Sequence, residues 1–392
     1  MPTSNASAPV PVPFEVSVPD ATLDDLRTRL ARTRWADDFA NETWSFGVER
    51  GYLTELTDYW RDGFDWRAQE AAMNAFSHWT VDVDGVPLHF LREPGRGPDP
   101  LPLVLTHGWP WTFWDYERVI RPLADPASFG GDPRDAFEVI VPSLPGYAFS
   151  SPLRTPGIGF VETADLWARL MRDVLGFDRF GAHGGDSGAY VSAQLGHAYE
   201  DRVVGVHLHF PMLLSLDFTT LLPDDYGPGE EGWFEQNRSG RHVSHYVVQI
   251  DDPQTLAYAM HDSPVGMAAW LLERRRAWSD CNGDVESRFT KDQLLTNASL
   301  YWLTETFATS VRFYAESYRT PWTPRHDRTP TVRVPTGIAV FPRELMLVPR
   351  EVAARHADLV HWTVMPRGGH FAPMEEPELL VDDLRTFYRS LR

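Results

Sequence analysis

The chain reads His183-Gly184-Gly185-Asp186-Ser187-Gly188-Ala189 where an apolar run over 177–182 gives way to a helix-like run over 190–199. A strand that turns sharply into a helix through small residues is the pattern of a nucleophile elbow. Crowding at such a turn leaves room only for glycine or alanine on either side and raises the central side chain above the sheet. Gly184 and Gly188 frame Asp186 in the pattern G-x-nucleophile-x-G. The segment therefore predicts a carboxylate nucleophile rather than a hydroxyl.

Strand-like and helix-like segments alternate on both sides of this elbow. A hairpin is expected first, from strands over 79–83 and 86–91 joined by Asp84-Gly85, a dipeptide typical of hairpin turns. Short apolar runs typical of strands buried on both faces follow at 101–106, 137–141, 179–182, 203–209, 334–341 and 359–365. This alternation predicts a mainly parallel central sheet flanked by helices. Together with the elbow, it indicates the α/β-hydrolase fold.

Two further regions read as helical. Residues 22–75 contain leucines at helical spacing, with Thr22 as the expected N-cap, and a second helix is expected over 48–60. The region 216–325 is helical in pattern and rich in aromatic residues, so we expect a lid above the carboxyl ends of the strands, where open α/β sheets bind ligands. We therefore divide the chain into an N-terminal extension, a core and a helical lid: 1–97, 98–215 with 326–392, and 216–325.

Composition limits the classes of function. The net charge of −19 argues against binding to nucleic acid or to an anionic membrane. The single cysteine, Cys281, excludes an intramolecular disulfide and a thiol-based metal site, and it fits a reducing compartment. Residues 1–13 lack the features of a signal peptide or an anchor, and no apolar run reaches the length of a membrane span. We expect a soluble, cytoplasmic protein.

Four segments bring reactive groups to the carboxyl edge of the predicted sheet. Besides Asp186, they are His107-Gly108-Trp109-Pro110, Glu344 and His370, and each follows a strand-like run. The chain order of nucleophile, acid and base is the order expected for this fold. The backbone N–H groups of Trp109 and of Ser187, which follows the nucleophile, are expected to form an oxyanion hole.

A carboxylate nucleophile implies chemistry in two steps. Asp186 attacks carbon by displacement and leaves an alkyl ester on the enzyme; water activated by His370, which Glu344 orients, then attacks the ester carbonyl. The first step needs a proton donor for the leaving oxygen. In the lid, Tyr314 can supply it, and Tyr246 is the candidate for a second donor.

These residues resemble the microsomal-type epoxide hydrolase family in sequence and order. The matching motifs are His107-Gly108-Trp109-Pro110, Gly184-Gly185-Asp186, Asp262-Ser263-Pro264-Val265-Gly266, Arg312-Phe313-Tyr314, Phe341-Pro342-Arg343-Glu344-Leu345 and Gly368-Gly369-His370-Phe371. Trp35 and Trp44-Ser45-Phe46-Gly47 are similar to the N-terminal domain of the same family, so the resemblance covers nearly the whole chain.

The resemblance implies an enzyme that converts a small-molecule epoxide and water to a vicinal diol without a cofactor or a metal. It implies that Asp186 is the nucleophile, His370 the base, Glu344 the orienting acid and Tyr314 a ring-opening tyrosine. The membrane anchor of the animal members has no counterpart here, so the chain is similar to a soluble bacterial member. A homodimer is left open.

The chain departs from the family pattern at three places. Ser187 stands where the family usually has Trp, and Trp111-Thr112 replaces the usual Gly-Ser. The spacing around Tyr246 is one residue short. These departures suggest a reshaped pocket for one bulky substrate, and an actinobacterial antibiotic pathway, enediyne pathways included, is the setting that we expect.

Alternatives remain open at this point. An elbow centred on Ser187 would make the protein a serine esterase, and a dehalogenase of haloalkanes or haloacids would also use Asp186. A non-catalytic binding protein is the alternative from another class. Glu375 and Glu376 lie closer to His370 in sequence than Glu344 does, but the position of Glu344 after the penultimate strand favours it as the acid.

Other polar residues are expected to be structural. We interpret His107 as a hydrogen-bonded histidine that shapes its loop. His207 and His209 share one strand face, but no third ligand is placed for a metal, so packing is the expected role. The run Arg274-Arg275-Arg276 is interpreted as a solvated helix face.

Overall fold

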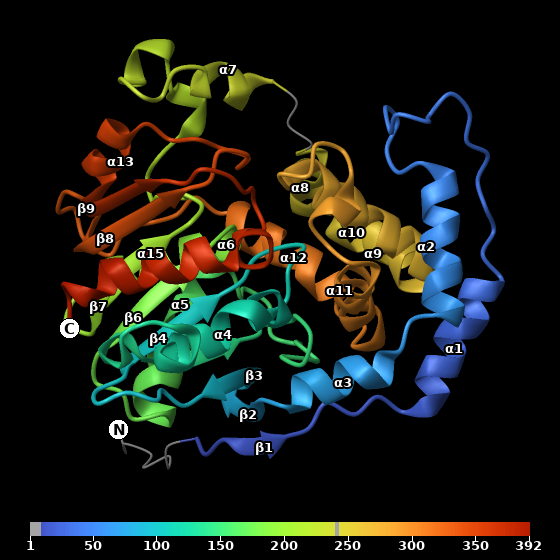
Figure 1. Cartoon of the computed structure of the whole chain (residues 1–392), viewed down its shortest axis with the longest axis horizontal. Helices are drawn as coiled ribbons and strands as arrows, with labels where there is room; N and C mark the ends of the chain where they lie inside the picture. The colour runs from blue at the N-terminus through green and yellow to red at the C-terminus, as the bar shows by residue number, and fades with distance from the viewer. Residues whose placement is uncertain (1–8, 240–242) are drawn as a thin grey trace.

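The computed structural model describes residues 9–239 and 243–392. One nine-stranded sheet crosses the molecule in the order β1-β2-β3-β5-β4-β6-β7-β8-β9 (Figure 1). The strands β4 to β9 pair in parallel with one another, whereas β1, β2 and β3 extend the sheet in antiparallel orientation. The prediction of a mainly parallel sheet is confirmed. The strands are β1 (Val12–Phe14), β2 (Ser77–Val83), β3 (Val86–Glu93), β4 (Leu101–Thr106), β5 (Phe137–Pro142), β6 (Phe180–Gly184), β7 (Val203–Leu208), β8 (Val332–Val340) and β9 (Ala357–Val364).

The β2–β3 hairpin forms at the predicted turn. Asp84 and Gly85 have φ of 56° and 80°, as a two-residue turn of type I′ requires, and Asp82 accepts a hydrogen bond from the Gly85 N–H (2.8 Å). In contrast, the sequence predicted no strand at β1, which overlaps the end of the N-terminal tail, residues 1–13. Pro13 is compatible with a strand here because β1 lies at the edge of the sheet. Residues 1–8 of that tail lie outside the described residues.

Helices cover both faces of the sheet, and each face has its own hydrophobic core. On one face, α5 (Phe160–Arg169) and α6 (Ser187–Ala198) pack together, and α6 contacts β4, β6, β7 and β8. On the other, α4 (Glu117–Ala124) packs against α15 (Pro377–Arg389). The strands between them are buried on both sides; every residue of β7, for example, is buried.

The N-terminal helices are α1 (Asp20–Ala31), α2 (Arg50–Asp62) and α3 (Trp66–Asn74), and they run along the outer side of the lid helices (Figure 1). The prediction of Thr22 as an N-cap is wrong. The cap position is Pro19, with φ −59° and ψ 141°, and Thr22 lies within the first turn of α1. The Val18 N–H donates to Glu70 of α3 (2.6 Å), and this bond sets where the chain enters the helix. The second predicted helix, α2, starts within two residues of the expected position.

The segment between β7 and β8 is helical, as predicted. It contains α7 (Trp233–Arg238), α8 (Ser244–Asp251), α9 (Pro253–Asp262), α10 (Pro264–Trp278), α11 (Lys291–Leu303) and α12 (Phe307–Tyr318). The helices α8 to α12 form one group, in which α12 packs on α8 and α9, whereas α7 lies apart, on the side of α13 (Arg350–His356) and β9 (Figure 1). Among the described residues, no helix combines the length and hydropathy needed to span a bilayer.

The interpretation of the arginine run as a solvated face is wrong. Arg274 and Arg275 of α10 are only 1% and 3% exposed. The Arg274 guanidinium stacks on Trp270 at 3.8 Å from the ring centroid. Arg275 donates to Asp115 of the core (2.6 Å) and lies 3.9 Å from the ring centroid of Phe371. The charge of these arginines does not predict their exposure to solvent, because each guanidinium has a partner that covers it.

Candidate active site

Asp186 lies at the turn between β6 and α6, with φ 50° and ψ −130°. A residue other than glycine seldom adopts a positive φ, so the surrounding structure must hold this turn in place. A Cβ atom at Gly184 would lie 2.1 Å from the carbonyl oxygen of Gly188, and one at Gly188 would lie 2.0 Å from that of Thr106. Only glycine fits at both positions, as the elbow pattern predicts.

Two backbone N–H groups point at the Asp186 carboxylate. The Trp109 N–H donates to Oδ1 (2.8 Å), and the Ser187 N–H is the second donor. The loop reaches this position because residue 108 is glycine: a Cβ atom there would lie 2.3 Å from Asp186 Oδ1. Burial raises the pKa of Asp186, but the hydrogen bond and charge of His370 and the two N–H groups outweigh it and hold the pKa below its usual value. The carboxylate is therefore ionised at neutral pH.

His370 lies between two carboxylates at the carboxyl ends of β8 and β9. Its Nδ1 is 2.6 Å from Glu344 Oε1, and its Nε2 is 3.5 Å from Asp186 Oδ2. Burial lowers the pKa of His370, but Glu344 and Asp186 reverse that effect and raise the pKa to about 10. In the resting protein, His370 is an imidazolium that bridges the two acids.

The structure places Glu344, and not Glu375, against the imidazole. The two loops that carry Glu344 and His370 run side by side through a parallel bridge between Arg343 and Gly369. Glu375 instead accepts hydrogen bonds from the backbone N–H groups of Phe371 (2.9 Å) and Asp280 (2.7 Å), and burial raises its pKa to about 7. Glu375 thus holds the loop on which His370 lies.

Tyr314 and Tyr246 lie at different depths. Tyr314, on α12, is 3% exposed, and its ring is 6.0 Å from that of Trp109. Burial, and then the Asp186 charge, raise the pKa of Tyr314 well above its usual value. Tyr246, on α8, is 41% exposed, and its ring centroid is 6.1 Å from that of Tyr314. The structure therefore brings Tyr314 to the nucleophile and leaves Tyr246 at the rim.

Sequence reasoning missed two residues beside the nucleophile. His245, one residue before Tyr246, is buried, and its ring stacks on Trp109 with centroids 5.2 Å apart. Tyr318 follows Tyr314 by four residues, and their ring centroids are 5.8 Å apart. That spacing is a signal in the sequence, because residues i and i+4 of a helix share one face. Which residue of α8 faces the interior, in contrast, depends on how the helix packs and cannot be read from the sequence.

The Ser187 side chain is hydrogen-bonded to a group other than the base. Its hydroxyl makes a hydrogen bond with Tyr318, whereas His370 Nε2 faces Asp186 Oδ2. A serine nucleophile would need the opposite arrangement. The geometry favours Asp186 as the reacting group.

The histidines near the elbow are hydrogen-bonded within the core. His107 Nδ1 lies 2.9 Å from the Gly108 carbonyl, and its Nε2 accepts from the Leu144 N–H (3.0 Å), as expected for a residue that shapes the loop. His183 lies between His207 and His209, at 2.9 and 3.2 Å. Across 9–239 and 243–392, no cluster of three or more His, Cys, Asp or Glu side chains could hold a metal ion.

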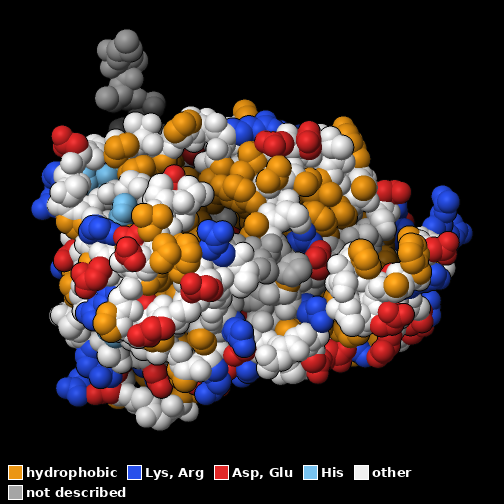
Figure 2. Space-filling view, turned by 90° about the horizontal axis from the view of Figure 1, so that it is seen from above, with side chains coloured by type: hydrophobic (Ala, Val, Ile, Leu, Met, Phe, Trp, Pro, Cys, Tyr) orange, Lys and Arg blue, Asp and Glu red, His pale blue; other side chains and the backbone are white. Residues whose placement is uncertain are grey.

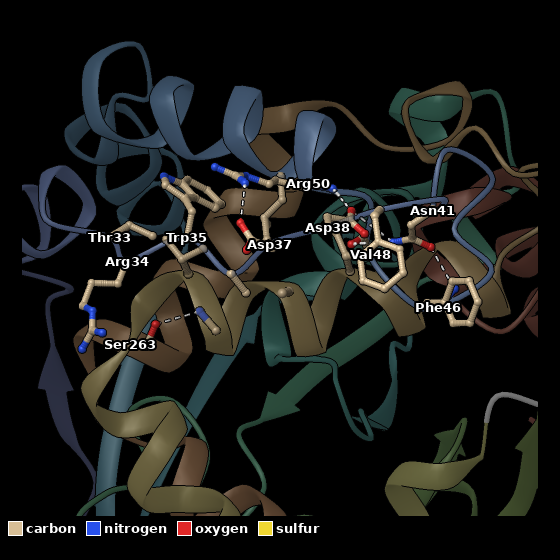
Figure 3. A pocket seen from close by; sticks show the side chains of 16 residues that line it. Thr33, Arg34, Trp35, Asp37, Asp38, Asn41, Phe46, Val48, Arg50 and Ser263 are labelled. Atoms are coloured by element: carbon tan, nitrogen blue, oxygen red, sulfur yellow. Dashed lines mark hydrogen bonds and ion pairs between the residues drawn. The ribbon is translucent and has the colours of Figure 1, made fainter.

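The molecular surface has two further features. Seen from above, hydrophobic side chains gather beside a hollow on one face (Figure 2). A separate pocket of about 540 Å³ lies between the loop 33–48 and the start of α10 (Figure 3). Its lining includes Trp35, Phe46 and Val265 but neither the nucleophile, the base nor the acid. This pocket is therefore not the candidate active site.

The sequence of the chain is similar to those of known epoxide hydrolases. Residues 11–116 match the family model "Epoxide hydrolase N terminus", and residues 102–377 match "alpha/beta hydrolase fold". A Stigmatella aurantiaca protein named as an epoxide hydrolase is 40% identical over 383 residues, which cover 97% of this chain and 85% of that protein. Epoxide hydrolase 1 of Oryctolagus cuniculus is 35% identical over 402 residues, with 96% and 88% covered.

Solved structures agree with the sequence comparison. The Aspergillus niger epoxide hydrolase superposes with a TM-score of 0.84 at 28% identity and covers 97% of each chain. The juvenile hormone epoxide hydrolase of Bombyx mori superposes with a TM-score of 0.88 at 28% identity, covering 97% of this chain and 95% of that one.

Proposed function

Because the chain belongs to the microsomal-type epoxide hydrolases, with their N-terminal region on an α/β-hydrolase fold, we propose that it opens its epoxide through a covalent ester on Asp186. One observation carries this proposal. The His370 imidazole contacts both carboxylates: its Nε2 lies 3.5 Å from Asp186 Oδ2, and its Nδ1 lies 2.6 Å from Glu344 Oε1. A nucleophile, a base and an orienting acid need this order.

In the first step, an Asp186 oxygen attacks an epoxide carbon and the ring C–O bond breaks. The leaving oxygen takes the phenolic proton of Tyr314, so that a hydroxyalkyl ester and a tyrosinate result. Tyr314 is suited to this role because it lies on the lid over the Trp109 loop, within reach of the Asp186 charge.

In the second step, His370 takes a proton from water, and the hydroxide attacks the ester carbonyl carbon. The N–H groups of Trp109 and Ser187, which hold the carboxylate at rest, then stabilise the oxyanion of the tetrahedral intermediate. Collapse releases the diol and restores the Asp186 carboxylate. The proton that His370 loses once the ester has formed passes through solvent to the tyrosinate, and the proton that it takes from water restores the imidazolium, so the overall reaction consumes one water per epoxide.

Two variants test this mechanism. Asp186→Asn is expected to abolish turnover, because an amide is a poor nucleophile. His370→Gln is expected to accumulate the alkyl-enzyme, since ring opening proceeds but the ester is not hydrolysed; intact-protein mass spectrometry with styrene oxide would detect the added mass. Full activity in Asp186→Asn, with loss of activity in Ser187→Ala, would instead identify a serine esterase.

The substrate and the biological setting are further proposals. Ser187 and Trp111 depart from the family pattern near Asp186, which supports one bulky epoxide as substrate; an actinobacterial antibiotic pathway, such as an enediyne pathway, is the setting that we propose. Competition between bulky and small epoxides for the same trapped ester tests this preference. We also propose a homodimer, which light scattering can detect, because Phe39 and Phe46 are 86% and 82% exposed beside the pocket of Figure 3.

A further inference from the structure

Tyr318 belongs to the aromatic group that faces the nucleophile. It shares one face of α12 with Tyr314, and its ring centroid lies 5.8 Å from that of Tyr314 and 5.9 Å from that of Tyr190 on α6. Burial raises the pKa of Tyr318 well above its usual value, and the Asp186 charge raises it further. The phenol is therefore neutral, carries its proton and lies within electrostatic reach of the nucleophile.

The hydroxyl of Tyr318 has a specific partner in Ser187. The hydrogen bond between them opposes the other effects on the pKa of Tyr318, as a donor to the phenolic oxygen does, because it favours the ionised form. Ser187 is also the residue whose backbone N–H points at Asp186. One residue thus contacts both the nucleophile and the phenol.

Tyr246 is less suited than Tyr318 to act on a group bound at Asp186. It is 41% exposed, and burial alone raises its pKa, without a contribution from Asp186. Its ring lies on the outer side of the group, 5.3 Å from that of Tyr318. Tyr318 therefore lies between Tyr246 and the elbow in this chain of contacts.

We propose that Tyr318, rather than Tyr246, is the second proton donor for ring opening, and that the Ser187 hydroxyl is its hydrogen-bond partner. This inference rests on the proposed function. As the ring C–O bond breaks, Tyr314 and Tyr318 both donate to the leaving oxygen, and one of the two protons transfers. The Ser187 O–H donates to the phenolic oxygen of Tyr318, which leaves the phenolic proton for the substrate and stabilises the developing tyrosinate. The tyrosinate regains its proton after ester hydrolysis.

The rate of ester formation tests this role. In the His370→Gln background, alkyl-enzyme formation from styrene oxide is followed by rapid quench and intact mass. Tyr318→Phe, which removes one oxygen, is expected to slow ester formation by about 10- to 100-fold without changing the melting temperature. Ser187→Ala is expected to slow the same step less, and adding it to Tyr318→Phe is expected to change nothing more. Tyr258→Phe, 72% exposed on α9, is the matched control that leaves the rate unchanged.

A second readout separates catalysis from support of the fold. With His370 intact, Tyr318→Phe is expected to leave the hydrolysis rate of the preformed ester unchanged, because the phenol acts only on the leaving oxygen. Ester formation at the parent rate in Tyr318→Phe, or a larger loss in Tyr246→Phe, would overturn the inference. Absence of an ester in the His370→Gln parent would instead overturn the proposed covalent mechanism.

Discussion

His370 depends on two acids for its charge, and this dependence is the main electrostatic property of the site. Glu344 and Asp186 lie on opposite sides of its ring, at 2.6 and 3.5 Å. In the proposed mechanism, esterification of Asp186 removes one of these charges, so the pKa of His370 is expected to fall in the alkyl-enzyme. The same imidazole is thus a cation while the nucleophile is free and becomes a base once the ester has formed.

The raised pKa predicts a loss of stability at alkaline pH. A histidine whose pKa rises from 6.5 to about 10 on folding contributes stability that is fully present below pH 6.5 and is lost as pH rises through about 10. In Glu344→Gln, one carboxylate is removed and the folded-state pKa of His370 is lower, so we expect this loss to be smaller and to be complete at a lower pH. Urea unfolding between pH 7 and pH 10.5 measures both curves; identical pH dependence in the two proteins would contradict the assignment.

The positions of single site residues could be predicted from the sequence when each residue directly follows a strand of the sheet. Asp186, Glu344 and His370 each follow a strand, and parallel strands end at one edge, so their meeting follows from topology. Tyr318 could have been predicted from its spacing of four residues from Tyr314, whereas His245 could not, because a helix presents a residue inward or outward according to its packing. At α8 the phase turns His245 inward and Tyr246 to the rim.

The helix α10 connects the lid to the core through Arg275. Its guanidinium donates to Asp115, 2.6 Å away, and both side chains are almost fully buried. Asp115 also accepts from the Thr112 N–H (2.9 Å), in the loop that carries Trp109. On its other side, Arg275 lies against Phe371, the residue after His370. One ion pair thus links the lid to the loops of the oxyanion donor and of the base.

Removing one partner of this pair is expected to be costly. Arg275→Met leaves a buried carboxylate without a countercharge, and we expect it to lower the free energy of unfolding by about 3–5 kcal/mol. The double variant Arg275→Met with Asp115→Asn should recover part of that loss. Arg27→Ala, which breaks the exposed pair with Asp24, is the control, with a cost of less than about 1 kcal/mol. Urea unfolding of the three variants measures these changes in the free energy of unfolding. Equal losses for Arg275→Met and Arg27→Ala would contradict the prediction.

At the scale of elements, the sequence predicted strands that are buried throughout, such as β7, and also β9, which was expected to be buried on both faces but is largely exposed or half-buried because it lies at the edge of the sheet. The strands from β2 to β9 were identified because apolar runs mark them. The strand β1 was missed, since its three residues are partly exposed and include a proline. Its existence depends on pairing with β2, which no local pattern encodes.

Across the whole molecule, a line of hydrogen-bonded histidines runs beneath the elbow. It passes from His209 through His183 and His207 to Asp383 on α15, and Asp383 also pairs with His361 on β9 (2.9 Å). Burial lowers the pKa of His183 and His209 well below the usual value, and repulsion between neighbouring imidazoles adds to the effect. His183 and His209 are therefore neutral in the folded protein.

These histidines predict sensitivity to acid. Burial also lowers the pKa of His89, and that of His107 to about 4. A histidine with a lowered pKa contributes stability above pH 6.5 that is lost as pH falls toward its folded-state pKa; for His107 the loss between pH 6.5 and pH 5 is roughly 2 kcal/mol. Glu375, whose pKa is raised to about 7, acts in the opposite direction, but it is a single group.

Unfolding free energies at pH 6.5 and pH 5 test this expectation. His107→Gln is expected to reduce the difference by roughly 2 kcal/mol, because glutamine can still accept the Leu144 bond but does not titrate. His261→Gln, on the exposed surface of α9, is the control and leaves the difference unchanged. An equal free energy of unfolding at the two pH values in the wild type would contradict the prediction.

The elbow has a consequence beyond this enzyme's own reaction. Its position is set by backbone contacts of Gly184, Gly188 and Thr106, and not by the chemistry of the side chain at 186. Any side chain placed there would leave the turn in the same direction, toward His370 and between the same two N–H groups. A single substitution at position 186 therefore changes the reacting group but not its position in the active site. A scaffold of this kind can acquire a new chemistry without a new fold.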